Sequence, residues 1–348
     1  MNRLVPPGPF RLLLTGIGLV VLLLLGWQLA DDLLLLFAAA LFAAAASRGA
    51  EALAGATPLS RGWALVLVLL GAVVLVAAFL WFAGLRFTSQ LEVLTERIPA
   101  GLDRVRDSLT ANPVLQPLTA EIESLIAQFR EGEGAAGSSL LTAFRVTTGT
   151  LFALVAWAVL VVFLAADLHR YSGAIVRLVP PRGREATQDL FEHLGGALTW
   201  WLLGRLVSMT LVGILTMVGL FLLGIPLAFA LGLIAGLFSF VPFLGPLAAT
   251  APAVLVALGQ GPTTALQVLG LYALVQFLES YLITPQVQKR MVSVPPVVLI
   301  AAQIGMGTLL GIGGVMFATP LALTVVVGIQ VLYLKRTLGE PVHVWGER

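Results

Sequence analysis

Two long apolar runs in the second half of the chain are interrupted by proline and glycine at corresponding positions. The interruptions fall at offsets of 10, 19 and 26 residues in one run and 10, 19 and 25 in the other: Pro226, Gly236, Gly245 and Pro252, then Pro295, Gly305, Gly314 and Pro320. Broken backbone inside a membrane is tolerated only where it is buried in protein or lines a cavity. A matching pair of such segments is typical of a transporter's binding site, so the pattern predicts two membrane hairpins and a transport function.

Composition places this chain in a bilayer. Of 348 residues, 59% are hydrophobic and 11% are charged, with a mean hydropathy of +0.99, whereas soluble domains are about one quarter charged. The net charge of +2 and the scattered basic residues argue against a nucleic-acid partner. The chain has no cysteine, which excludes disulfides and thiolate metal sites.

The first half contains four apolar segments long enough, or nearly so, to cross the hydrocarbon. They are Leu12–Leu29, Leu33–Ala46, Trp63–Leu85 and Phe144–Ala166. The first could instead be a signal peptide, but its apolar core is longer than usual for one. Arg48, Arg61 and a linker from His169 to Arg184 then share one side, which the positive-inside rule assigns to the cytoplasm together with both termini. The expected location is therefore the bacterial inner membrane, with multiple passes.

Residues 86–134 are unlike the rest, because charged positions alternate with apolar ones at helical spacing. The span order places this segment outside. Two interpretations stay open: a helical cap on the membrane surface, or a subunit contact that uses the apolar stripe as a coiled seam.

In the second half, Trp200–Leu223 and Thr264–Ile283 predict two further spans. Between and after them lie the first hairpin, 226–258, broken at 241–246, and the second, 295–334, which turns at 311–314. The first enters from outside and the second from inside, so they form an inverted repeat unless the matching glycines serve only helix packing. The expected organisation is spans 1–3 in 1–85, the charged segment in 86–142, span four and its linker in 143–197, a transport core in 198–336 and a tail in 337–348.

Few polar groups fall inside the predicted spans, and these are the candidates for chemistry. Glu279 is either a proton or cation site or an interfacial carboxylate paired with Lys289 or Arg290. Arg205 either extends its charge to the interface or pairs with substrate or with Glu279. Gln276 and Gln303 are suited to interhelical hydrogen bonds. The predicted pathway adds the residues of the two breaks, which are Pro242, Gly245, Pro246, Gly311, Gly313, Gly314 and Pro320.

An enzyme, a metal site and a cofactor are not expected. The histidines His169, His193 and His343 fall in the predicted linkers and tail, without an HExxH helix. There is no GxSxG elbow and no phosphate-binding loop. A transporter driven by an ion gradient or by the gradient of its substrate fits these absences.

The chain also resembles the AI-2E transporters. The resemblance rests on Gly224-Ile225-Pro226, on the turn at 241–246, on Glu279-Ser280-Tyr281-Leu282-Ile283-Thr284-Pro285 and on the run from Gly311 to Pro320. It implies a bacterial inner-membrane protein of about eight spans and a homo-oligomer, with a pentamer among the candidates. Some members are assigned export of autoinducer-2, and others sodium(lithium)/proton antiport. Members tend to have Gly-Gln where this chain has Gly204-Arg205, which puts transfer of the substrate in doubt.

We therefore expect an all-α membrane protein of about eight spans that exports a small polar organic molecule such as an autoinducer-2-like signal. Sodium(lithium)/proton antiport through Glu279 is the alternative. A non-transporting scaffold that binds partners through 86–134 is an alternative of another class. The expected partners are the lipid bilayer, the substrate or cation, and further copies of the chain.

Overall fold

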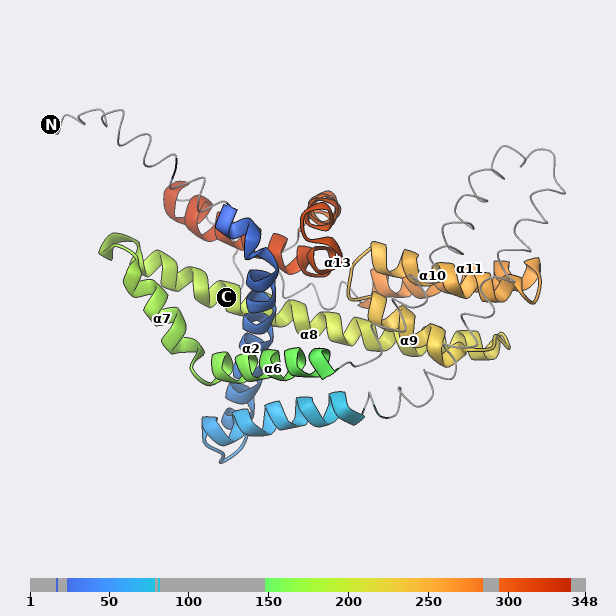
Figure 1. The fold of residues 1–348 in the computed structure, drawn as a ribbon, viewed down its shortest axis with the longest axis horizontal. Coiled ribbons are helices and arrows are strands. Elements are labelled where there is room, and N and C mark those ends of the chain that lie inside the picture. The colour runs from blue at the N-terminus through green and yellow to red at the C-terminus, as the bar shows by residue number, and fades with distance from the viewer. Residues whose placement is uncertain (1–16, 18–23, 79–80, 82–147, 284–293, 339–348) are drawn as a thin grey trace.

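The computed structural model describes residues 17, 24–78, 81, 148–283 and 294–338 (Figure 1). Within these residues the regular elements are all helical, which confirms the predicted all-α fold. In the described part of the chain, five helices are long and apolar enough to cross a membrane, or six if one bent pair counts as a span. Most of the predicted span Leu12–Leu29, the whole of 86–134 and His343 lie outside the described residues.

The N-terminal half packs around α2, Ala30–Ala56, which lies against α6, Thr148–Ala166. Ala39 and Ala43 of α2 are fully buried, because small side chains let two apolar helices approach closely. The helix Arg61–Ala78 follows α2. The sequence predicted that the span would end at Ala46, but α2 continues past Arg48, since its alanine-rich sequence favours helix.

The predicted Arg-rich linker is largely helical. α6 bends by 75° into α7, Leu168–Leu178, and the 3-10 turn η2, Pro181–Gly183, leads into α8. His169 therefore lies in a helix, contrary to the prediction. The reason is the helical spacing of the apolar residues in this segment, which the charged residues between them obscure.

The longest uninterrupted helix among the described elements is α8, Arg184–Leu222, which runs across the molecule in Figure 1. Its 39 residues extend for about 58 Å, roughly twice the thickness of the hydrocarbon. The predicted span Trp200–Leu223 lies almost entirely within this helix, which begins sixteen residues earlier, with charged turns before the apolar part. His193 is consequently a buried helical residue and not a linker residue.

The first predicted hairpin consists of α9, Ala228–Phe238, and α10, Leu244–Leu258. At 11 and 15 residues, the arms extend for about 16 and 22 Å and are shorter than the hydrocarbon thickness of about 30 Å. α9 lies directly on α8, because a Cβ at Gly236 would be 2.8 Å from the Met209 carbonyl oxygen of α8. The turn is equally tight, since a Cβ at Gly245 would overlap the carbonyl oxygen of Phe238.

The second predicted break is also present. α11, Pro262–Leu278, continues as the π-helical turn η3, Glu279–Ile283. α13, Pro296–Gly328, and the π-helical η4, Ile329–Leu338, follow. The backbone of α13 breaks at Gly311, with φ 59° and ψ −144°, a left-handed φ that glycine adopts without strain. A Cβ at Gly314 would overlap the Met306 carbonyl oxygen, much as at Gly245 in the first hairpin.

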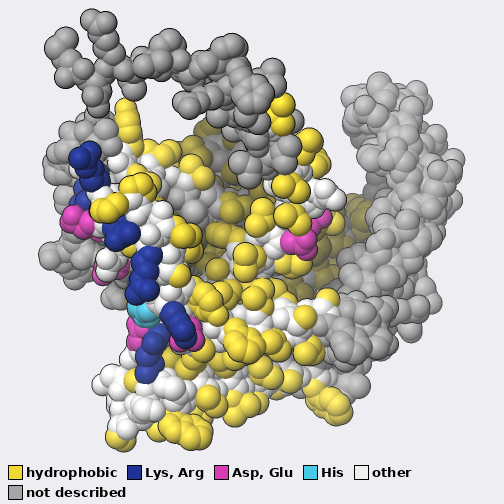
Figure 2. All heavy atoms as spheres, turned by 60° about the vertical axis from the view of Figure 1, so that its left-hand side comes forward, with side chains coloured by type: hydrophobic (Ala, Val, Ile, Leu, Met, Phe, Trp, Pro, Cys, Tyr) yellow, Lys and Arg dark blue, Asp and Glu magenta, His cyan; other side chains and the backbone are white. Residues whose placement is uncertain are grey.

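Lys and Arg side chains gather along one edge of the molecule with several acidic side chains, while much of the visible surface is apolar (Figure 2). Arg61 pairs with Glu51 at 3.4 Å, Arg48 donates to the Glu192 carbonyl oxygen at 3.3 Å, and Arg336 pairs with Glu185 at 3.3 Å. These contacts join α2, the helix Arg61–Ala78, the start of α8 and η4. The basic positions that were predicted to share a membrane side thus lie together.

Candidate functional site

A buried cluster of polar side chains lies at the turn between α9 and α10. Arg205 of α8 pairs with Glu279 of η3, with 3.2 Å between Nη1 and Oε1. The Arg205 Nε also donates to the carbonyl oxygen of Phe240 in the turn, at 3.1 Å. Ser208 donates its hydroxyl to the same Oε1 of Glu279 at 2.5 Å. One carboxylate oxygen thus accepts from two donors on α8.

Helix geometry explains why these donors converge. Arg205 and Ser208 are three residues apart on α8, so they lie on one face of the helix. Glu279 begins the π-helical turn that continues α11. Single π turns widen a helix locally and are frequent at functional sites.

The second hairpin joins the cluster through Gln303, which donates to the Pro242 carbonyl oxygen at 2.8 Å. This carbonyl lies in the break, between the end of α9 and the start of α10. Phe240 packs edge-on against Phe317 on the other arm of the second hairpin, with ring centroids 6.0 Å apart. The turn of the first hairpin therefore contacts both arms of the second.

The cluster is largely closed to solvent. The side chain of Glu279 is 4% exposed and that of Arg205 is 11% exposed. Within the described residues, Glu279 Oε2, Arg205 Nη2 and Gln303 Oε1 are buried without a hydrogen-bond partner. An unsatisfied buried polar group costs about 1–3 kcal/mol, and more when it is charged. The cluster thus contains one cationic donor and two acceptors that are buried without a partner among the described residues.

The structure brings together four of the residues singled out in the sequence, namely Arg205, Glu279, Gln303 and Pro242. Gln276 does not join them, since its amide donates to Ser280 at 3.3 Å. The alternative partners of Glu279, Lys289 and Arg290, lie outside the described residues.

The other singled-out residues belong to the hairpin turns or arms. Gly245 and Pro246 open α10, and Pro320 is buried within the second arm. Gly311 is exposed, whereas Gly314 is buried. A Cβ at Gly313 would lie 3.2 Å from Leu34 of α2. The turn of the second hairpin therefore lies beside α2, while the turn of the first lies between the arms of the second.

Sequence reasoning missed Ser208 and the carbonyl group of Phe240. The spacing of Ser208 from Arg205 is a signal that could have found the first. The proline pattern predicts that the break leaves a backbone carbonyl without its helical donor. Which side chain donates to this carbonyl depends on how the hairpins pack.

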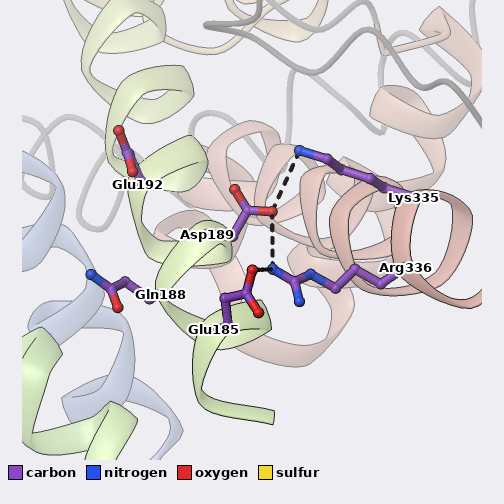
Figure 3. A pocket seen from close by; sticks show the side chains of 6 residues that line it. All are labelled: Glu185, Gln188, Asp189, Glu192, Lys335 and Arg336. Carbon is purple, nitrogen blue, oxygen red and sulfur yellow. Dashed lines mark ion pairs between the residues drawn. The ribbon is translucent and has the colours of Figure 1, made fainter. Parts of the chain in front are cut away.

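A second polar region is an open depression of about 620 Å³ between the start of α8 and η4 (Figure 3). It is lined by Glu185, Gln188, Asp189, Glu192, Lys335 and Arg336. Asp189 pairs with Lys335 at 3.5 Å and lies 3.1 Å from His193. The Asp189–Lys335 contact joins the start of α8 to η4. We assign the candidate site to the buried cluster instead, because ionisable groups within the spans are costly and typically functional.

The described residues contain no group of three or more His, Cys, Asp or Glu side chains arranged to hold a metal ion. The polar groups of the buried cluster are a guanidinium, a carboxylate, a hydroxyl, an amide and backbone carbonyls. Such a set is suited to binding and orienting a polar solute.

Several known bacterial proteins are similar to this chain in sequence. PerM of Escherichia coli (strain K12), provisionally named a permease, is 26% identical over 282 residues, 76% of this chain and 77% of PerM. YueF of Bacillus subtilis (strain 168), provisionally named a transport protein, is 26% identical over 215 residues, 62% of this chain. The matched region spans little more than half of the Bacillus relatives, 56% of YueF and 51% of YrrI. The family model described as AI-2E family transporter matches residues 17–333. The chain therefore belongs to the AI-2E family of membrane transporters.

Proposed function

We propose that this protein is a secondary transporter that exports a small polar organic molecule, such as an autoinducer-2-like signal, through the buried cluster at the first hairpin. The observation that carries the proposal is the Arg205–Glu279 ion pair, which is buried at the break in an apolar segment and retains one unpartnered polar atom on each side chain. An ionisable pair inside the membrane-spanning part of a protein is costly and typically functional. A ligand bound beside the pair would supply the hydrogen bonds that these two atoms lack.

The ligand would accept a hydrogen bond from Arg205 Nη2 and donate to Glu279 Oε2 and Gln303 Oε1. The guanidinium and the carboxylate compensate each other, so the site favours an uncharged hydroxyl-bearing molecule over a free ion. Export then requires that the site open alternately to the two sides. The short arms of the two hairpins are elements that can move as units against α8 and the N-terminal helices.

Sodium(lithium)/proton antiport is the second candidate. It is favoured by the oxygen atoms near Arg205, which come from the Glu279 carboxylate, the Ser208 hydroxyl and the Phe240 carbonyl. Oxygen ligands are those that hard cations prefer. The charge of Arg205 opposes a cation at this position, so antiport would require Arg205 to withdraw from Glu279 during the cycle.

Reconstitution in liposomes separates the two candidates. The purified protein is reconstituted with a pH dye inside, and sodium, lithium or a labelled autoinducer-2-like molecule is added in turn. Movement of the organic solute without a proton signal, lost in Glu279→Gln and retained in Gln276→Ala, supports export. A proton signal on adding sodium or lithium that is lost in Glu279→Gln establishes antiport. Solute transport at an undiminished rate in Glu279→Gln would contradict the proposed site.

The surrounding organisation is part of the same proposal. The N- and C-termini and the charged edge face the cytoplasm of a bacterial inner membrane, residues 198–336 form the transport core, and spans one to four form the frame of a homo-oligomer. Exposed apolar side chains on the helix Arg61–Ala78, among them Leu75 at 70%, support a lipid or subunit contact there. The transport proposal predicts that deletion of 86–134 leaves solute movement in liposomes intact, whereas a scaffold that binds partners through this segment would lose its function.

A further inference from the structure

The helix α7 has an apolar side that nothing in the described protein covers. Its 11 residues include none that is buried. Tyr171, Ile175 and Leu178 are spaced by 4 and 3, so they form one stripe, and they are 44%, 48% and 85% exposed. The opposite side of α7 packs against α8, α2 and α6, whereas the stripe has no such cover within the described protein. The stripe therefore indicates an external apolar surface.

Two exposed arginines flank this stripe. Arg170 and Arg177 are seven residues apart and share a face, about a third of a turn from the apolar side. Within the described part of the chain, neither guanidinium is paired with a carboxylate. The next residue round the helix, His169, lies 3.3 Å from Arg61 and so faces the protein. The arrangement is that of an interfacial helix, with an apolar side, a basic flank and a side against the protein.

The position of α7 agrees with this interpretation. It follows the apolar α6 after a bend of 75°, so a steeply crossing α6 places α7 nearly parallel to the membrane surface. Arg184 at the start of α8 donates to the carbonyl oxygens of Arg177 and Val179, at 3.2 and 3.1 Å, and holds the end of α7 in place.

We infer that α7 is a binding surface for anionic phospholipid. The stripe of Tyr171, Ile175 and Leu178 enters the acyl region, and Arg170 and Arg177 extend to the phosphate groups. Each arginine near the membrane surface favours anionic over zwitterionic lipid by about fivefold. This inference concerns the anchoring of the frame, and it holds whichever solute crosses the protein.

The absence of cysteine from the chain gives a direct test. Ile175→Cys carries a nitroxide in the full-length protein in liposomes, and its collisions with oxygen and with a water-soluble nickel complex are compared. Leu75→Cys is the reference within the apolar zone and Gln188→Cys the aqueous reference. The Ile175 label is expected to resemble the Leu75 label. A label as accessible to nickel as that at Gln188, or one shielded from both reagents by a protein partner or second copy, would overturn the inference.

The lipid headgroup is tested with a fluorophore at the same cysteine. Quenching by nitroxide-labelled phosphatidylglycerol is compared with quenching by the corresponding phosphatidylcholine. We expect a severalfold preference for phosphatidylglycerol that falls to about one in R170Q/R177Q and persists in R182Q, a matched change in η2. Equal quenching by the two lipids in the protein with native arginines would contradict anionic-lipid binding.

Discussion

Removal of either partner of the Arg205–Glu279 ion pair leaves the other buried without its counter-charge. Breaking a buried pair from one side costs about 3–5 kcal/mol. Glu279→Ala is therefore expected to lower the free energy of unfolding by about this amount. Gln276→Ala, one turn earlier and outside the cluster, should lower it by less than about 1 kcal/mol. Unfolding in detergent micelles measures both, and equal effects would show that the pair contributes little.

The glycine at the turn of the second hairpin offers a test of its close packing. Gly314→Ala places a methyl group on the Met306 carbonyl oxygen, so we expect a loss of about 1–3 kcal/mol or more. Gly305→Ala in the same helix meets open space, and alanine favours helix there. Thermal unfolding of the two variants should differ in this direction. Equal melting temperatures would contradict the tight turn.

For single residues, the sequence predicted which ionisable groups belong to the site better than it predicted which groups they contact. An ionisable residue in an apolar run stands out by composition alone, which identified Arg205 and Glu279. Their pairing depends on how η3 packs against α8, and 74 residues separate the two positions. Ser208 was missed because serine is common in membrane helices, and only its spacing from Arg205 distinguishes it.

At the scale of the element, the contact between α8 and α9 positions the turn that receives Arg205. Gly232 and Gly236 lie against α8, where Gly213 approaches within 3.1 Å of a Cβ built at Gly236. Gly236→Val should separate the helices and move the Phe240 carbonyl away from Arg205. Gly270→Val on α11, where a Cβ meets open space, is the matched control.

We expect Gly236→Val to lower both the melting temperature and the transport rate in liposomes, although Gly236 does not touch the buried cluster. The control should keep its transport rate and nearly its melting temperature, because the intrinsic cost of valine in a helix is about 0.7 kcal/mol or less. Transport that is unchanged in Gly236→Val would show that the α8–α9 contact does not position the site.

Both hairpin breaks were predictable because proline removes a backbone donor and glycine permits a left-handed φ, which are local effects. The extent of α8 and the presence of α7 were not predicted. The charged residues of 169–199 were interpreted as a linker, but they lie on helices that continue beyond the apolar zone. The length of these helices depends on packing and not on composition.

For the whole molecule, the gathering of charge along one edge implies a defined orientation. Gln188 lies in the charged depression, and Gln260 follows α10 at the far end of the first hairpin, where its amide donates to the Gly224 carbonyl oxygen. An impermeant maleimide added to intact cells should label Gln260→Cys and not Gln188→Cys. After permeabilisation both should react. The reverse pattern would place the charged edge outside and contradict the proposed topology.

The most direct test of the transport site neutralises both members of the pair at once. Arg205→Met with Glu279→Leu removes both charges and substitutes apolar residues of similar size, a change that is often nearly neutral for folding. We predict that the double variant unfolds at nearly the same temperature as the parent and no longer moves solute or protons in liposomes. A folded double variant that transports at the parental rate would show that the Arg205–Glu279 pair is structural and that the site lies elsewhere.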